Sequence, residues 1–173
     1  MSFKQFKALT FDVVGTLIDF EAGILAHMRE VSGEAGKAHS DDDILKAYRE
    51  ARAMEDAGWF PDDLERCYHL MARALGLPDN DDYAKGLAAS VKNWPAFPDS
   101  VEALKRLRKH YKLVAMTNAQ RWALDHMAAT LEQPFDFEFT IDDSRFEKPD
   151  PQYFGYVRGA LATQGILFED ILH

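Results

Sequence analysis

The chain has 173 residues, of which 47% are hydrophobic and 28% charged, as is ordinary for a water-soluble globular protein. Lys and Arg number 20 against 29 Asp and Glu, giving a formal net charge of -9. This argues against nucleic acid or an acidic membrane as a partner, because both need clustered positive charge. A single cysteine, Cys67, excludes an intramolecular disulfide and a thiolate zinc cluster. With no long apolar run and no signal-peptide pattern, we expect a cytoplasmic protein.

The first predicted element is a buried β-strand over residues 7–13, where Leu9, Phe11 and Val13 alternate with other side chains. The strand runs into Asp12, and a glycine and a threonine follow within the next few residues. In open α/β sheets, ligands bind at the carboxyl ends of the strands. We therefore expect the Asp12 carboxylate to lie at the mouth of a site.

Four helical segments and no strand are predicted between residues 20 and 94. The first, over 20–31, has apolar residues at helical spacing and is ended by Gly33 and Gly36, and the second, over 41–56, has Ser40 as its N-cap. Two further amphipathic segments follow, each begun by acidic residues. Residues 20–94 are thus predicted to be an all-helical insertion.

After residue 95 the pattern changes to short strands that alternate with helices. Strands are predicted over 111–116 and 135–141, a charged loop over 142–148, and the start of another strand at Ile171 and Leu172. Alternation of this kind predicts an α/β fold with a doubly wound parallel, Rossmann-like sheet. Its core would comprise residues 1–19 and 95–173.

Polar residues follow three of the predicted strands: Asp12 with Thr16, then Thr117 with Asn118, then Lys148. The carboxyl ends of parallel strands meet at one edge of a sheet, so these residues should converge. A carboxylate beside a lysine ammonium is a plausible nucleophile whose charge is balanced. The hydroxyl of Thr117 and the amide of Asn118 could bind an anionic group of a substrate or hold the nucleophile.

Together these motifs resemble those of the haloacid dehalogenase superfamily. The first motif of that family matches Asp12-Val13-Val14-Gly15-Thr16, the second matches Thr117-Asn118, and the third matches Lys148-Pro149. The helical insertion directly after the first motif resembles the helical cap of one branch. The resemblance extends over essentially the whole chain and implies a hydrolase with an aspartate nucleophile.

Val14 decides between the branches of the family. Phosphatases of the superfamily usually carry a second aspartate there as a general acid, and valine cannot transfer a proton. Halide leaves without protonation, so Val14 favours dehalogenation, although the dehalogenases typically have an aromatic residue at this position. The segment 44–49 resembles the cap segment of L-2-haloacid dehalogenases whose arginine receives halide, which makes Arg49 a candidate. The chain departs from the dehalogenases again at Ala119 and Phe154, where they carry glycine and tyrosine.

The resemblance implies a two-step reaction on a small anionic 2-haloacid, without a metal or other cofactor. Asp12 would displace halide to form an ester, and water would then hydrolyse that ester at the aspartate carbonyl. Lys148 would balance the charge of Asp12, and Arg49 would draw off the halide. The residues implied are Asp12, Lys148 and Thr117 as catalytic groups, and Asn118, Arg49, Val14 and Thr16 around the substrate.

Two other interpretations stay open. One is a phosphatase of unusual type, with Mg²⁺ held by Asp12 and the backbone carbonyl of Val14. The other is an inactive fragment or interaction protein, because the family's fourth, acidic motif would begin beyond His173. If the chain ends there, the C-terminal part of the core is missing, and an exposed sheet edge would favour association, so we expect a homo-oligomer, most simply a dimer.

Overall fold

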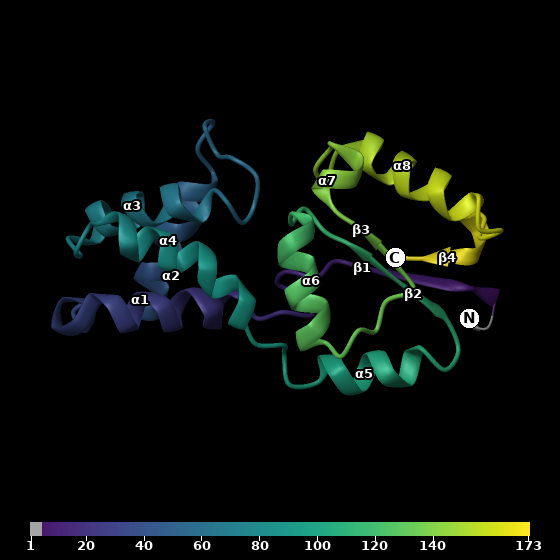
Figure 1. Cartoon of the computed structure of the whole chain (residues 1–173), viewed down its shortest axis with the longest axis horizontal. Coiled ribbons are helices and arrows are strands. Elements are labelled where there is room, and N and C mark those ends of the chain that lie inside the picture. The colour runs from purple at the N-terminus through teal and green to yellow at the C-terminus, as the bar shows by residue number, and fades with distance from the viewer. Residues whose placement is uncertain (1–4) are drawn as a thin grey trace. The chain divides into compact units, whose positions relative to one another are not determined.

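The computed structural model describes residues 5–173, and the chain divides into two compact units (Figure 1). One unit comprises the described residues up to Ile18 together with Ala96–His173, and the other comprises Asp19–Pro95. Within the described residues, none of the helices combines the length and the hydropathy that a transmembrane span requires.

The unit Asp19–Pro95 is helical throughout its regular structure, as the sequence predicts. Its elements are α1 (Phe20–Gly36), α2 (Asp41–Arg52), α3 (Leu64–Leu75), α4 (Asp81–Ser90) and the 3-10 turn η2 (Val91–Asn93). Gly33 interrupts α1 with φ 53° and ψ -134°, a conformation that glycine adopts without steric cost. Ser40 begins α2 through a capping box with Asp43. Helix α2 ends at Arg52, four residues before its predicted end.

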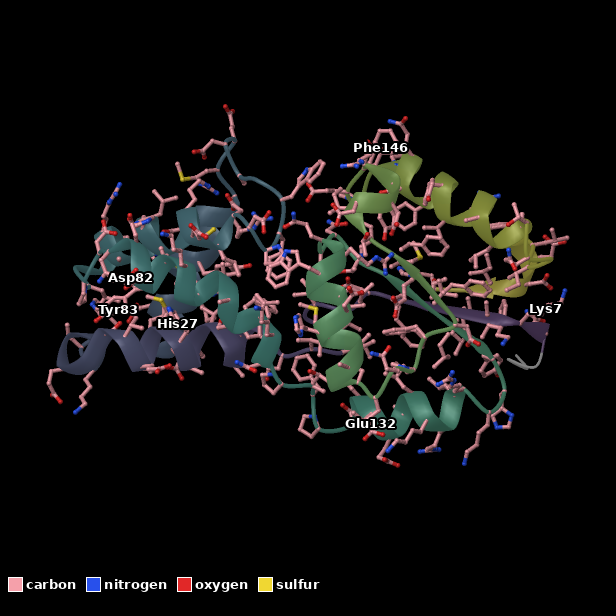
Figure 2. The ribbon with its side chains drawn as sticks, viewed as in Figure 1. Lys7, His27, Asp82, Tyr83, Glu132 and Phe146 are labelled. Carbon is pink, nitrogen blue, oxygen red and sulfur yellow. The ribbon has the colours of Figure 1, made fainter. Side chains whose placement is uncertain are left out.

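Close packing in this unit depends on two glycines that face aromatic rings. A Cβ at Gly23 would collide with the indole of Trp94, which is 2% exposed, and a Cβ at Gly86 would collide with the imidazole of His27. His27 lies near Tyr83 (Figure 2), and its Nε2 makes a hydrogen bond of 2.8 Å with the Tyr83 backbone oxygen. Helices α1 and α4 therefore approach closely, because the His27 ring of α1 packs against a residue of α4 that has no side chain.

The other unit contains a four-stranded parallel sheet, which confirms the predicted fold class. The strands are β1 (Ala8–Phe11), β2 (Lys112–Met116), β3 (Phe137–Phe139) and β4 (Ile171–Leu172), in the order β3-β2-β1-β4. The helical elements are α5 (Ser100–Leu107), α6 (Arg121–Thr130), α7 (Ile141–Ser144), α8 (Pro151–Ala162) and the 3-10 turn η3 (Phe168–Asp170). Figure 1 shows α5 and α8 on opposite faces of the sheet.

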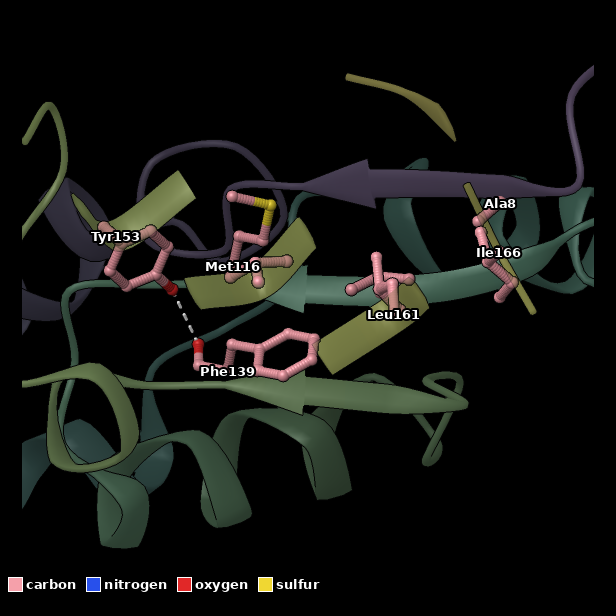
Figure 3. Packing of buried hydrophobic residues seen from close by; sticks show 8 residues of the cluster. Ala8, Met116, Phe139, Tyr153, Leu161 and Ile166 are labelled. Atoms are coloured by element: carbon pink, nitrogen blue, oxygen red, sulfur yellow. Dashed lines mark hydrogen bonds between the residues drawn. The ribbon is translucent and has the colours of Figure 1, made fainter. Parts of the chain in front are cut away.

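Helix α8 closes one face of the sheet. Tyr153 and Leu161 on α8, both without exposed surface, pack on Met116 of β2 and Phe139 of β3 (Figure 3). Each large apolar side chain buried in this way stabilises the fold by roughly 1.5–3 kcal/mol. The contact fixes α8 over the carboxyl ends of two strands, which is where the sequence predicts a site.

The segment 142–148 is not simply the charged loop that the sequence predicts. Thr140 caps the short helix α7, with its hydroxyl 2.7 Å and its amide nitrogen 2.8 Å from the Asp143 carboxylate. This reciprocal pairing forms a helical turn too short to give a periodic apolar pattern.

Candidate active site

Asp12 is the first residue after β1, and a closed turn follows it. Within the turn, the Leu17 amide donates to the Val13 carbonyl at 2.9 Å, and the Gly15 amide donates to the Ile18 carbonyl at 2.9 Å. Gly15 has φ 88°, which a side chain would strain. The chain therefore reverses directly after the carboxylate, whose side chain is left 40% exposed.

Lys148 approaches Asp12 from the loop that follows α7. Its Nζ donates to Asp12 Oδ1 at 2.6 Å and to the carbonyl oxygen of Met116, the last residue of β2, also at 2.6 Å. The lysine side chain is 16% exposed. The second carboxylate oxygen, Oδ2, accepts a longer bond of 3.3 Å from the Thr16 hydroxyl. Oδ1 of Asp12 is thus bound by the Lys148 ammonium group, whereas Oδ2 makes a longer and weaker hydrogen bond with a neutral hydroxyl.

Asn118 contacts Lys148 rather than Asp12. Its Nδ2 donates to the Lys148 carbonyl at 2.9 Å, and its Oδ1 accepts from the Lys148 amide at 2.7 Å. The side chain that follows β2 therefore holds the backbone of the residue that pairs with Asp12.

Thr117 is 1% exposed and joins the ends of β2 and β3. Its amide donates to the Phe139 carbonyl at 3.0 Å, and its hydroxyl oxygen accepts from the Ala119 amide at 3.1 Å. The Tyr153 hydroxyl donates to the backbone oxygens of Thr117 and Phe139, at 3.2 and 2.9 Å. Burial raises the pKa of the Tyr153 phenol, so this hydroxyl keeps its proton. No role for Tyr153 is predicted from the sequence, because its partners are backbone groups.

Arg121, also without a predicted role, ties α6 to the start of α7. Its guanidinium lies 2.9 Å from Glu138 Oε2 and 2.7 Å from Asp143 Oδ2. Burial would raise the pKa of Asp143, but hydrogen bonds from Thr140 and the charge of Arg121 outweigh it and lower that pKa. At Glu138 burial prevails over Arg121, and the pKa is raised. This cluster steadies the segment that leads to Lys148.

Val14 and Arg49 complete the set of predicted site residues. Val14 lies in the turn after Asp12, half-buried, in a bridge with Ile18, and it offers no proton. Arg49 belongs to α2 of the helical unit, where its Nη1 lies 3.4 Å from Glu21 Oε1. Both partners of that pair are about half exposed, with side-chain exposures of 57% and 46%, and such pairs contribute at most about 1 kcal/mol. The role of Arg49 stays a prediction.

The donor set around Asp12 does not fit a magnesium site. Mg²⁺ requires about six oxygen ligands, several of them carboxylates, phosphates or water. No group of three or more His, Cys, Asp or Glu residues placed to hold a metal occurs in the described part of the chain. The carboxylate of Asp12 is instead paired with the ammonium of Lys148.

A separate apolar pocket of about 280 Å³ lies beside β1, β4 and α8. Its walls include Met116, Phe154 and Leu161, with Arg158 and His173 among its polar residues. It includes none of the side chains that the sequence predicts for the site. We therefore place the candidate active site at Asp12 and not in this pocket.

Comparison with known proteins identifies the family. A family model described as haloacid dehalogenase-like hydrolase matches residues 6–173. The chain belongs to the haloacid dehalogenase-like hydrolases, and it is an enzyme of that class. The resemblance seen in the sequence motifs is thereby confirmed.

Individual relatives are more distant. (S)-2-haloacid dehalogenase 4A from Burkholderia cepacia is 24% identical over 155 residues, which cover 87% of this chain and 67% of the relative. The L-2-haloacid dehalogenase from Xanthobacter autotrophicus matches with a TM-score of 0.76 and 21% identity, covering 96% of this chain and 68% of that one. A HAD-hydrolase from Bacillus subtilis bound to magnesium matches with a TM-score of 0.68 and 17% identity, covering 89% and 73%. The structural matches establish a shared fold.

Proposed function

We propose that this hydrolase removes halide from small 2-haloacids of S configuration through an ester on Asp12. The observation that carries the proposal is the pairing of Asp12 with Lys148 at 2.6 Å, at the carboxyl edge of the sheet. It supplies an exposed carboxylate whose charge is balanced and which is available as a nucleophile. The relative from Burkholderia cepacia, named as an (S)-2-haloacid dehalogenase, supports the choice of substrate.

In the first step, Asp12 Oδ2 attacks the carbon that bears the halogen. Oδ2 is the natural choice because Oδ1 is held by Lys148 Nζ at 2.6 Å, whereas the contact of Oδ2 with the Thr16 hydroxyl is longer, at 3.3 Å. A carbon–oxygen bond forms, and the carbon–halogen bond breaks with its electron pair leaving on the halide. The configuration at that carbon is inverted.

In the second step, water attacks the carbonyl carbon of the Asp12 ester. The 2-hydroxyacid leaves with one proton from the water, the other passes to solvent, and the carboxylate is regenerated. Negative charge develops on the carbonyl oxygen during this attack, and the ammonium of Lys148 would stabilise it.

The residue two positions after the nucleophile supports halide as the leaving group. An alkoxide leaving group requires a proton donor, which Val14 cannot be, whereas halide leaves as an anion without one. Within this proposal, Arg49 accepts the departing halide, and Thr117 helps to bind the substrate carboxylate. The proposal routes no step through a metal.

Label transfer from water tests the mechanism directly. The protein is incubated with (S)-2-chloropropionate in water enriched in heavy oxygen, with a metal chelator present. We expect halide release, formation of the R hydroxyacid, and label in the peptide that contains Asp12. Asp12→Asn should release no halide. Label that enters the product without ever entering Asp12 would overturn the ester.

Assays on the same purified protein distinguish the dehalogenase from the two other interpretations, a phosphatase and an interaction protein. Mg²⁺-dependent release of phosphate from an aryl phosphate, without release of halide from any haloacid, would establish that the protein is a phosphatase. Absence of both activities would favour an interaction protein. The expected homodimer is a further proposal, and light scattering that gives the mass of one chain would contradict it.

A further inference from the structure

The two polar atoms of the Asn118 side chain are both used by one residue, Lys148. Nδ2 donates to the Lys148 carbonyl at 2.9 Å and Oδ1 accepts from the Lys148 amide at 2.7 Å, across 30 residues of sequence. Two antiparallel bonds between an amide and a single peptide residue fix both the position and the orientation of that residue.

The far end of Lys148 is held by the same stretch of chain. Its Nζ donates to the carbonyl of Met116, two residues before Asn118, at 2.6 Å, and to Asp12 Oδ1, also at 2.6 Å. Lysine has a long flexible stem, and its ammonium group does not fix its own direction. The segment 116–118, at and just after the end of β2, therefore binds both the backbone and the ammonium group of Lys148.

We propose that Asn118 is a positioning residue, which acts on the reaction through Lys148. By holding the Lys148 backbone, it places the ammonium group between Met116 and the nucleophile Asp12. The consequence for turnover rests on the proposed function, but the positioning itself does not.

Chemical labelling of Lys148 tests the positioning without any turnover. Wild type and Asn118→Ala are treated with a trace of acetic anhydride, and acetylation of each lysine is measured by mass spectrometry. We expect Lys148 to react several times faster in the variant, because its ammonium group is released from Met116 and Asp12, while other lysines keep their rates. The control is Asn80→Ala, which removes the N-cap of α4, where Asn80 Oδ1 accepts from the Tyr83 amide at 2.9 Å. It should leave Lys148 unchanged.

The kinetic arm separates positioning from substrate contact. Asn118→Ala should lower kcat with little change in KM, and the double variant with Lys148→Ala should be no slower than Lys148→Ala alone, because the two residues act as one unit. The proposal would be overturned if the double variant lost kcat by the product of the two single losses. It would also be overturned if Asn118→Ala raised KM and left kcat unchanged.

The test also covers a variant that does not fold and a wild type that releases no halide. If Asn118→Ala does not fold, Asn118→Thr replaces it. Threonine has a similar volume, but its hydroxyl cannot bind the Lys148 carbonyl and the Lys148 amide together as the Asn118 side chain does. Unchanged labelling of Lys148 in a folded variant overturns the inference. If wild type releases no halide, the proposed function fails, and the labelling still decides whether Asn118 positions Lys148.

Discussion

Lys148 and Asp12, 136 residues apart in the sequence, meet at 2.6 Å between Nζ and Oδ1. The two residues are positioned by different elements: Asp12 directly follows β1, whereas Lys148 lies in the loop after α7, whose start is capped by Thr140. The pair therefore depends on the loop after β3 as much as on the sheet. Loss of either partner leaves an uncompensated charge in a partly buried position, which is costly.

Lys148→Ala should reduce halide release by about 10²–10³-fold, because removing one group that stabilises developing oxyanion charge has effects of that size. The measurement is the initial rate of halide release at saturating haloacid. Lys105→Ala is the matched control, since Lys105 is an exposed residue that pairs with Glu102 and Glu132 on the surface. A Lys148→Ala rate equal to that of the control would contradict the assigned role.

Tyr153→Phe should lower the free energy of unfolding by about 1–3 kcal/mol, because it removes a buried hydroxyl donor, and the Phe139 carbonyl oxygen then keeps only its bond from the Thr117 amide. The phenol now reaches the backbone oxygens of Thr117 and Phe139 at 3.2 and 2.9 Å. Denaturant unfolding measures the change. The control is Tyr156→Phe on the same helix, where the side chain is 43% exposed and little change is expected. Equal losses in both variants would show that the buried hydroxyl contributes nothing.

Much of the fold could be predicted because its signals are local. Ser40 begins α2 as an N-cap, and the apolar strands give the parallel sheet, although α1 continues past Gly33 to Gly36. The exception is α7, whose four residues are too few for helical periodicity and which depends on one capping pair. The early end of α2 at Arg52 was also missed, since the residues that follow include good helix formers.

The site was predictable only in part. That Asp12 and Lys148 would approach each other followed from strand ends sharing one edge of a sheet. The use of Asn118 on the Lys148 backbone, and of Tyr153 on two carbonyls, did not follow. Backbone partners carry no side-chain signature, so a sequence cannot say which carbonyl a donor will meet.

Gly23→Ala and Gly159→Ala should change stability in opposite directions. At Gly23 the added methyl group meets the buried indole of Trp94, and overpacking of this kind costs about 1–3 kcal/mol. At Gly159, within α8, a Cβ would have no atom within 4 Å, so alanine should gain about 0.5–1 kcal/mol through its higher helix propensity. Urea unfolding followed by circular dichroism compares the two. A stable Gly23→Ala would mean that Trp94 can move aside.

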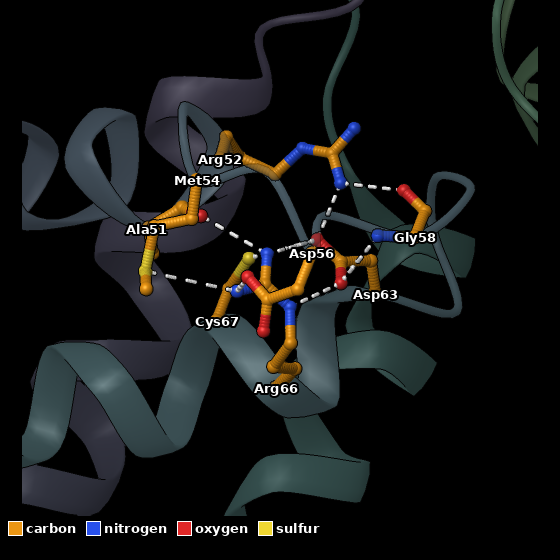
Figure 4. A network of polar contacts seen from close by, with 8 residues as sticks. All are labelled: Ala51, Arg52, Met54, Asp56, Gly58, Asp63, Arg66 and Cys67. Carbon is orange, nitrogen blue, oxygen red and sulfur yellow. Dashed lines mark hydrogen bonds and ion pairs between the residues drawn. The ribbon is translucent and has the colours of Figure 1, made fainter.

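Asp63 is the centre of a polar network in the helical unit (Figure 4), with a side chain that is only 3% exposed. Its carboxylate is bound by Arg52, by the Arg66 guanidinium at 2.6 Å and by the Gly58 amide at 2.9 Å. Burial by itself would raise the pKa of Asp63, but the hydrogen bonds, chiefly from Arg66 and Gly58, prevail and lower it to about 2. The network ties the segment between α2 and α3 to the start of α3.

Asp63→Asn should therefore destabilise the protein by roughly 2–3 kcal/mol at neutral pH, and the loss should shrink in acid. The folded-state pKa of about 2 lies below the ordinary value of 3.8, so this stabilisation is complete above the ordinary value and disappears as pH falls through the folded-state pKa. Urea unfolding of wild type and variant at about pH 6 and about pH 3 measures the difference at each pH. Glu55→Gln, which neutralises an exposed carboxylate in the same segment, should have little effect at either pH. A difference between wild type and Asp63→Asn that stays constant down to about pH 2 would show that the stabilisation does not come from the ionised carboxylate.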